Sequence, residues 1–382
     1  MKVTYLYIAM AFVLACMWAC TEDAPESGMA NAEASRIYLS AGVDEVRSSR
    51  AAYYPTDASG NPLSVPTDNH PLNVSVWAST TQGVFADNGL TGYTGEVAIH
   101  SNAHFKNGDP QLFGDGDIIY PQNKNVYFVG LHPQGSSWVP SADHTKATFT
   151  FTGKEDVMFA PYISGVYGTG KNIKSFEFHH LLTWLRIEMA ADKSKESIFD
   201  REEVSKAWGN IVSMTISSQN QVIVDLSKED FSANDITFGE TTEIFPFYQK
   251  GTDNVYPPDD SSIPTGTQGG EEVAYVMCAP VQCLEKRYDE DGNEVDPSEY
   301  IISIKTENRD LEIPIDLKDE NGNPLNGVST MGKQFTVLLN FKLGNVIGVS
   351  AGISLSAETE WYTHGTGTGE LTESLFESNS SN

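Results

Sequence analysis

The sequence has few cysteines, and they give no sign of a metal site. Only four occur among 382 residues, and two of them, Cys16 and Cys20, stand in the first twenty. The other two, Cys278 and Cys283, form no CxxC pair and no His/Cys cluster with the spacing of a zinc site. We therefore expect two separate thiols, at least one of them buried, with a disulfide between them as the alternative.

Positive charge is also scarce. The chain has 24 Lys and Arg against 52 Asp and Glu, which gives a formal net charge of -28. A chain of this charge repels phosphate backbones and anionic lipid head groups. Nucleic acid is therefore not expected as a partner, and any association with a membrane must come from something other than a basic surface.

Catalytic and metal-binding motifs are missing. The sequence contains no phosphate-binding loop or metalloprotease helix. His179 and His180 are adjacent and point to opposite faces of a strand, so we expect one buried and one exposed histidine and no shared metal. The acidic run 289–293 has its Gly too early for a calcium loop, and Tyr300 stands where the bidentate Glu belongs. We expect no enzymatic activity, no cofactor and no metal.

One long apolar run stands at the N-terminus. Residues 3–19 are almost wholly apolar, follow Lys2, and precede the acidic residues Glu22 and Asp23. This order is typical of an export signal, and the run is shorter than the ~20 residues of a membrane-spanning helix. The pattern predicts a signal peptide at residues 1–20.

Two cysteines close this run, each after an alanine. Ala19-Cys20 and Ala15-Cys16 both resemble the lipobox of bacterial lipoproteins, in which the Cys becomes the first mature residue and carries the lipid. We favour Cys20 because acidic residues follow it directly, and Cys16 is the alternative. Acyl chains, palmitate among them, would anchor the protein in the outer membrane without a basic surface. Residues 21–35, which lack periodicity, would then form a flexible tether.

The rest of the chain contains a series of short predicted strands, separated by turn-forming clusters. The clearest alternating runs are 37–43, 72–78, 126–129, 147–151, 211–217, 222–226, 273–277, 300–304, 311–315, 335–341 and 349–357. The best helical pattern is at 195–208, with Ile198, Val204 and Ala207 as its apolar stripe. Many short strands with few helices predict an all-β fold built from β-sandwiches.

The length of the chain fits two domains of ordinary size. A polar stretch at 190–203 marks the expected boundary between them. We predict an N-terminal sandwich at residues 36–190, a C-terminal sandwich at 191–362 and a polar tail at 363–382.

The segment 153–189 is the most informative part of the sequence. It holds Asp-Val-Met-Phe-Ala at 156–160, then a spacer and the run Phe-Glu-Phe-His-His-Leu-Leu-Thr-Trp-Leu-Arg-Ile-Glu-Met at 176–189. This pattern resembles the signature of the fimbrillin-like family of the Bacteroidales, whose positions are filled here by Phe178, His180, Leu182, Leu185 and Ile187. The apolar alternation changes parity after Leu182, which predicts a bulge or kink near Thr183-Trp184.

The resemblance implies a fold and a function. It implies two tandem transthyretin-like, Greek-key β-sandwich domains with few short helices, exported as a lipoprotein. Such proteins are pilins or accessory and tip subunits of type V pili, the surface fimbriae that support adhesion. An arginine-specific protease cuts after the first strand, and a strand of another subunit fills the uncovered groove. The implied partners are other pilin subunits and the lipid of the outer membrane.

The chain offers a position for each step of this scheme. Arg47 and Arg50 follow the predicted first strand, 37–43, in a loop rich in Ser and Ala that a protease could enter. The candidate donor strand, which can equally complete its own domain, comprises Val349, Ala351, Ile353, Leu355 and Ala357. The scheme expects the strand at 37–43 to lie at a sheet edge over the core, and a position in the middle of a sheet with partners on either side would make strand replacement implausible.

A second function is compatible with the same sequence. A surface lipoprotein of this fold could capture a host glycan or protein through exposed aromatic side chains, without polymerising. The candidate side chains are Trp138, Tyr162, Tyr167 and Trp208. Burial of these side chains would remove the basis for this alternative.

Overall fold

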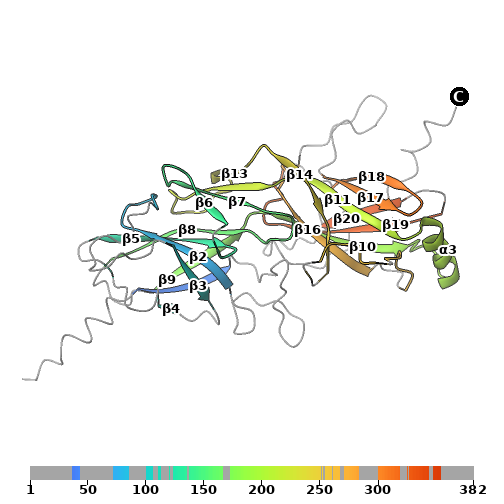
Figure 1. The fold of residues 1–382 in the computed structure, drawn as a ribbon, viewed down its shortest axis with the longest axis horizontal. Coiled ribbons are helices and arrows are strands. Elements are labelled where there is room, and N and C mark those ends of the chain that lie inside the picture. The colour runs from blue at the N-terminus through green and yellow to red at the C-terminus, as the bar shows by residue number, and fades with distance from the viewer. Residues whose placement is uncertain are drawn as a thin grey trace, which may run out of the picture.

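The structure, a computed structural model, describes residues 37–43, 72–85, 100–105, 111–112, 120, 124–135, 137–166, 173–250, 252, 254–259, 261–266, 271–283, 300–318, 325, 327–343 and 347–353. This part of the chain is an elongated stack of β-sheets with one α-helix near one end (Figure 1). No helix within it is long and apolar enough to cross a membrane. The predicted all-β class is confirmed.

Seven strands form the sheet at one end of the molecule, here called the N-terminal sheet (Figure 1). Its order is β3 (His100–Phe105), β2 (Leu72–Ser79), β5 (Asn125–His132), β8 (Met158–Val166), β9 (Ile173–His180), β1 (Tyr38–Val43) and β4 (Gln111–Leu112). The pairing of β5 with β8 shifts between Phe128 and Gly130. Phe128 faces one apolar core and Val129 the other, because neighbouring residues of a strand point to opposite faces, so both faces of this sheet are used.

One face of the N-terminal sheet encloses a core of its own, the N-terminal cluster. The sheet curls around this core, because the rings of Phe105 on β3 and Phe176 on β9 lie 6.2 Å apart although three strands separate them in the sheet order. Its buried members are Ile37, Leu39, Ala41, Leu72, Val74, Val76, Ala78, Phe105, Tyr120, Val126, Phe128, Met158, Ala160, Phe176 and Phe178. Ile37, directly before β1, and Leu39 and Ala41 within it supply the first three of these side chains.

Four short strands form a second sheet, the bridging sheet, which draws on distant parts of the sequence. Its order is β13 (Ile236–Phe238), β12 (Gln221–Asp225), β7 (Lys146–Thr150) and β6 (Trp138–Pro140). β7 and β12 run antiparallel, from the pair Gln221–Thr150 to the pair Asp225–Lys146. A 3-10 turn, η1 (Ala233–Asp235), leads into β13. Strands from before and after the predicted domain boundary are therefore hydrogen-bonded in one sheet.

Two further sheets form a sandwich at the other end of the molecule. The five-stranded sheet has the order β15 (Tyr248–Gln249), β16 (Glu271–Cys278), β10 (Thr183–Ala191), β19 (Gln334–Phe341) and β20 (Ile347–Ile353). The C-terminal four-stranded sheet has the order β14 (Thr242–Pro246), β11 (Ile211–Gln219), β17 (Tyr300–Thr306) and β18 (Asp310–Ile315). Side chains of both, such as Ile187 and Ile302, join those of the bridging sheet in one continuous core, the large cluster.

β10 belongs to the sheets of the C-terminal end, although the sequence predicted it as the last strand of the N-terminal sandwich. It pairs with β16 on one side and with β19 on the other. The chain thus changes sheet at residues 181–182, upstream of the predicted division at 190/191. That division and the transthyretin-like topology stay predictions.

The predicted helix is present as α3 (Ile198–Trp208) and lies against β10 and β19. Its predicted apolar stripe is wrong at two positions, because Ile198 and Ala207 are exposed. The buried positions are Arg201, Val204 and Trp208. Trp208 fixes the helix, since its indole Nε1 donates to the Lys342 carbonyl at 2.8 Å and its ring packs against Phe341.

Candidate strand-exchange site

β1 is the second strand from one end of the N-terminal sheet, between β9 and β4. It runs parallel to β9 and pairs with it along its whole length, from Tyr38–Ile173 to Val43–Phe178. On its other side lies the two-residue strand β4, which pairs with Tyr38 and Leu39. From Ser40 onward, no strand within the described residues pairs with this side. β1 is therefore the second strand from the end of the sheet and not the edge strand that the scheme expects, although within the described residues its outer partner covers only two positions.

The inward side chains of β1 fill the N-terminal cluster. Ile37, Leu39 and Ala41 are 0%, 1% and 3% exposed. They alternate along the strand and share their core with Phe176 and Phe178 of β9, whose ring centroids lie 5.8 Å apart. Burial of Ile37 and Leu39 is worth about 1.5–3 kcal/mol each. Without β1, these aromatic rings would lose one wall of their packing.

β1 is joined to β9 by its backbone pairing and by a side-chain contact, in which Ser40 Oγ donates to the Lys174 carbonyl at 3.4 Å. The backbone ladder and the apolar side chains of Leu39 and Ala41 hold the strand in place. Both are interactions that another strand with the same alternation could make.

The predicted donor strand is largely β20. Val349, Ala351 and Ile353 lie in β20, whereas Leu355 and Ala357 fall outside the described residues. β20 pairs antiparallel with β19 at the end of the five-stranded sheet, with Ile353 opposite Phe335. In this structure β20 completes its own sheet, which is one of the two roles that the sequence left open.

The family-signature residues mark the change of sheet. Phe178, on β9, lies in the N-terminal cluster, whereas Leu182, Leu185 and Ile187 lie in the large cluster. The expected kink near Thr183-Trp184 is a complete break between β9 and β10, which join different sheets. Periodicity signalled the change of face but could not show that the partner strands change as well.

His180 stands at this break and is anchored by a carboxylate. Its Nδ1 lies 2.8 Å from Asp156 Oδ1, and both side chains are almost fully buried. His179 points the other way, and its ring stacks on Phe231 with 3.9 Å between the ring centroids. His180 is buried as predicted for one of the pair, whereas His179 is half-buried rather than exposed. The part of the chain that the structure describes holds no group of three or more His, Cys, Asp or Glu that could bind a metal.

A network of buried hydroxyl groups holds the start of β10. Thr183 Oγ1 donates to the Thr330 carbonyl at 2.8 Å and lies 2.7 Å from Thr330 Oγ1. Thr330 Oγ1 also accepts from the Val281 N–H at 2.8 Å, and the Tyr300 hydroxyl donates to the Ala279 carbonyl at 3.1 Å. Burial raises the pKa of the Tyr300 phenol. The network connects the start of β10 to the loop at 279–281 and to the loop that contains Thr330.

The two cysteines of the body lie beside this network. Cys278 and Cys283 are both free and buried. Burial raises the pKa of the Cys278 thiol, which keeps it protonated and unreactive. The expected pair of separate thiols is what the structure contains.

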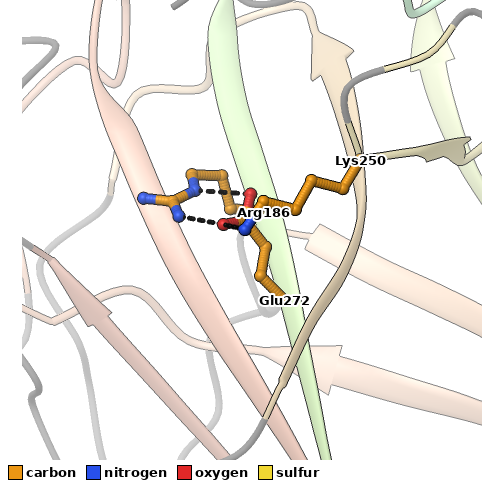
Figure 2. Close-up of polar contacts among 3 residues, drawn as sticks. All are labelled: Arg186, Lys250 and Glu272. Carbon is orange, nitrogen blue, oxygen red and sulfur yellow. Dashed lines mark hydrogen bonds and ion pairs between the residues drawn. The ribbon is translucent and has the colours of Figure 1, made fainter. Parts of the chain in front are cut away.

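A small ion group of Arg186, Glu272 and Lys250 joins β10 to β16 (Figure 2). Arg186 donates to Glu272 twice, from Nε to Oε1 at 3.0 Å and from Nη2 to Oε2. Lys250 Nζ lies 2.9 Å from the same Oε2. Burial by itself would raise the pKa of Glu272, but the hydrogen bonds and positive charges of Arg186 and Lys250 together lower it below its usual value. The group ties β10 and β16 to the residue that follows β15.

Aromatic side chains proposed for ligand capture are buried. Trp138, Tyr162 and Trp208 are only 1–3% exposed and belong to the large cluster, while Tyr167 lies outside the described residues. Trp138 packs on Phe149, and Tyr162 packs on Tyr127. These three side chains are therefore core residues, and their burial removes the basis for the ligand-capture alternative that they were named for.

Several predicted positions lie outside the described residues. These are the lipidation candidates Cys16 and Cys20, the cleavage candidates Arg47 and Arg50, the segments 1–20 and 21–35, and the tail 363–382. Two contributors to the site were missed by the sequence reasoning, namely β4 at the outer side of β1 and Asp156 as the partner of His180. β4 is too short to give a pattern, whereas Asp156 is part of the quoted signature and could have been considered as a partner.

Several proteins of known structure are similar to this chain. Among curated proteins none matches. Similar solved structures include a candidate cell adhesion protein from Bacteroides uniformis, 14% identical over 86% of this chain and 99% of that one, with a TM-score of 0.49. The fimbrial anchor protein Mfa2 from Porphyromonas gingivalis is 8% identical over 83% and 96% of the chains, with a TM-score of 0.38. A fimbrial assembly protein from Parabacteroides distasonis is 9% identical over 83% and 94%, with a TM-score of 0.38.

The family match gives the identity directly. The sequence pattern of the fimbrillin-like proteins matches residues 64–262, more than half of the chain. The matched region runs from before β2 to beyond β15 and includes the segment that changes sheet. The chain belongs to the fimbrillin-like family.

Proposed function

We propose that this protein is a structural, tip or accessory subunit of a type V fimbrium on the cell surface, where it supports adhesion without catalysis. Membership of the fimbrillin-like family supports a pilus-related role at the cell surface. In this proposal the signal peptide at 1–20 directs export, and the lipid on Cys20, or on Cys16, holds the protein in the outer membrane. Assembly proceeds by removal of β1 and its replacement with a strand of another subunit.

The observation that carries the proposal is the position of β1. Its side chains are built into the N-terminal cluster, yet within the described part of the chain one of its sides is paired over only two residues. A cut after Arg47 or Arg50 would leave β1 attached only through non-covalent contacts. Its departure would open an apolar groove along β9, whose unpaired backbone groups and aromatic side chains favour a replacement strand.

Cleavage and polymerisation test the proposal together. The full chain is expressed with its signal peptide in a host that displays an arginine-specific protease, and surface extracts are examined by mass spectrometry and gel electrophoresis. We expect loss of the N-terminal segment through Arg47 or Arg50 and a ladder of polymers. The double variant Arg47→Ala/Arg50→Ala should stay uncut and monomeric, whereas the control Arg36→Ala, just before the strand, should assemble. An uncleaved monomer in the presence of active protease contradicts the proposal.

Lipid attachment is tested separately by labelling with a palmitate analogue. Cys20→Ala should abolish the label and release the protein from the outer membrane, while Cys16→Ala should keep both. The reverse result would assign the lipid to Cys16. A label that neither substitution removes would contradict anchoring through this part of the chain.

A further inference from the structure

A hollow lies on the outer face of the C-terminal four-stranded sheet, at the end of the molecule away from the N-terminal sheet (Figure 1). Ser303 and Lys305 line it, and Ile302 and Ile304, which alternate with them along β17, are buried in the large cluster. The hollow therefore opens to solvent on the face opposite the core. Its volume of about 290 Å³ is at the lower end for small-molecule pockets, about 300 Å³, so it fits one small ring rather than a larger ligand.

Strand register brings five polar side chains together in this hollow. Ser213 on β11 lies opposite Lys305 on β17, and Lys305 lies opposite Asp310 on β18. In the next row along the strands, Ser303 lies opposite Glu312. All five residues line the hollow. Its walls therefore offer two hydroxyl groups, one ammonium group and two carboxylates.

A β-bulge decides which side chain of β11 reaches the hollow. Ile211 pairs with Thr306, so an unbroken register would put Val212 opposite Lys305. The pairing shifts at this point, and Ser213 takes that place instead. The bulge thus puts a hydroxyl group where an apolar side chain would stand, and bulges commonly re-aim side chains in this way beside functional sites.

The polar groups of the hollow are available to a ligand. No hydrogen bond or ion pair joins the side chains of Ser213, Ser303 or Glu312 to another of the described residues. Lys305 Nζ lies 3.6 Å from Asp310 Oδ2, and because both side chains are more than half exposed, this ion pair is weak. Hydroxyl and ammonium groups donate hydrogen bonds, whereas hydroxyl and carboxylate oxygens accept them. A matching ligand carries several groups that both donate and accept, as the hydroxyl groups of a sugar do.

An apolar strip borders the hollow on the same face. Ile301 and Pro314 lie opposite each other, one row beyond Ser303 and Glu312. Ile301 is 51% exposed, and Pro314 is exposed as well. Rows on one face of a strand are about 7 Å apart. A second sugar, linked to the one in the hollow, would therefore lie with its C–H groups against this strip.

Charge narrows the class of ligand further. Two carboxylates and one ammonium group leave the hollow with one excess negative charge, on a chain whose net charge is already -28. An anionic ligand is therefore repelled. A metal ion is not favoured either, because the described residues hold no group of three or more His, Cys, Asp or Glu that could bind one.

We propose that the hollow binds the terminal neutral hexose of a glycan, through hydrogen bonds between its five polar side chains and the hydroxyl groups of the ring. This inference goes beyond the proposed function, because the site is complete in a single subunit and needs no removal of β1. Capture of a glycan, first expected at aromatic side chains that prove to be buried, thus has a different site.

Binding of methyl glycosides to the full-length, uncleaved protein tests the class of ligand. In ligand-observed NMR titrations with the methyl glycosides of glucose, galactose and mannose, we expect at least one to bind with a Kd of about 1–10 mM, as suits so small a molecule. Methyl glucuronide, which adds a carboxylate to the ring, should bind about fivefold more weakly. Absence of binding by all three neutral glycosides, or equal binding of the glucuronide, overturns the inference.

Two matched double variants test the site. Ser303→Ala/Glu312→Gln removes a hydroxyl group and a carboxylate from the hollow and should weaken binding about tenfold. The control Ser217→Ala/Glu203→Gln removes the same two groups from exposed positions on β11 and α3 and should bind as the natural protein does. Both variants should keep the thermal unfolding midpoint, because the four side chains belong to neither core cluster. Equal affinity of the two variants overturns the assignment.

Neutral hexoses terminate host glycans and bacterial polysaccharides alike, and coated beads distinguish these two sources. Retention of the protein on mucin beads or on beads of a neutral bacterial polysaccharide identifies the source, provided that Ser303→Ala/Glu312→Gln abolishes it, and retention on neither overturns the inference. A protein that is cleaved and polymerises but binds no sugar rejects this inference alone. Sugar binding by a protein that never assembles supports the site and counts only against the proposed assembly.

Discussion

At Gly130 the N-terminal sheet has no room for a side chain. A Cβ at this position would lie 2.5 Å from Phe178 Cζ and 3.3 Å from the Ala160 Cβ. Gly130→Ala should therefore lower the free energy of unfolding by about 1–3 kcal/mol, the usual cost of overpacking, as measured by urea denaturation. Gly266→Ala is the matched control, because nothing lies within 4 Å of its Cβ, and its effect should stay within about 0.5 kcal/mol. Equal effects of the two substitutions would contradict the packing described for β5 and β9.

Glu272 makes the stability of the five-stranded sheet depend on pH. Arg186 and Lys250 hold its pKa in the folded protein below the ordinary value of 4.5. A carboxylate with a depressed pKa stabilises the folded state above its unfolded pKa, and that contribution is lost as the pH falls through the folded pKa. Urea denaturation between neutral pH and about pH 3 should therefore show a smaller loss of stability for Glu272→Gln than for the natural protein.

The matched control for this pH effect is Glu312→Gln, on an exposed position of β18. It should lose as much stability on acidification as the natural protein does. If Glu272→Gln and the natural protein lose stability equally, the ion group in Figure 2 does not contribute to acid sensitivity.

The burial of a single residue could be predicted where the alternation of the strand and the type of the side chain indicated the same environment. The burial of His180 followed from its place among alternating apolar residues, and the structure adds its Asp156 partner. Exposure of Trp138 and Trp208 could not be judged from sequence, because an aromatic residue beside a turn has the same local pattern whether its ring faces a core or solvent. Their burial is decided by strands and loops far away in the chain.

At the scale of elements, the start of β10 depends on the hydroxyl network around Thr330. Thr330→Val removes the acceptor of the Val281 N–H and leaves Thr183 with fewer partners, so we expect a loss of about 1–3 kcal/mol in the free energy of unfolding. Thr183→Val should also destabilise, and the double variant should cost less than the sum of the two. Chemical denaturation of the four proteins measures this coupling, expected at about 0.5–3 kcal/mol. Strict additivity would show that the two hydroxyl groups act independently.

Strands were more predictable than their partners. Alternation at 72–78 and 211–217 located β2 and β11, because a half-buried strand reveals its period within a few residues. Pairing of β1 with β9 in parallel, and of β7 with β12 across the predicted boundary, depends on contacts between distant segments that leave no local trace. For the same reason the local pattern of β10 could not show that its partners are β16 and β19.

At the scale of the whole molecule, the bridging sheet joins the two ends. β7 pairs with β12, and Phe151 packs on Phe245 with 5.5 Å between the ring centroids. Tyr248 donates its hydroxyl to the Thr152 carbonyl at 3.1 Å, and the Met277 N–H donates to the Gly153 carbonyl at 2.6 Å. Side chains of the N-terminal, bridging and C-terminal sheets share the large cluster. The interface is therefore continuous core rather than a contact between finished domains.

This continuity predicts that the molecule unfolds as one unit. Phe149→Ala, in the buried centre of the bridging sheet, should cost about 3–5 kcal/mol and shift a single calorimetric transition, with the calorimetric and van't Hoff enthalpies staying equal. The control Ile244→Ala, at a side chain 73% exposed on β14, should leave that transition within about 0.5 kcal/mol of the natural protein. Two transitions, of which Phe149→Ala moves only one, would show independent ends. A single transition would show that the two ends unfold together. A subunit that has lost β1 would then keep the shape of its groove, because the opposite face of the N-terminal sheet stays packed in the large cluster.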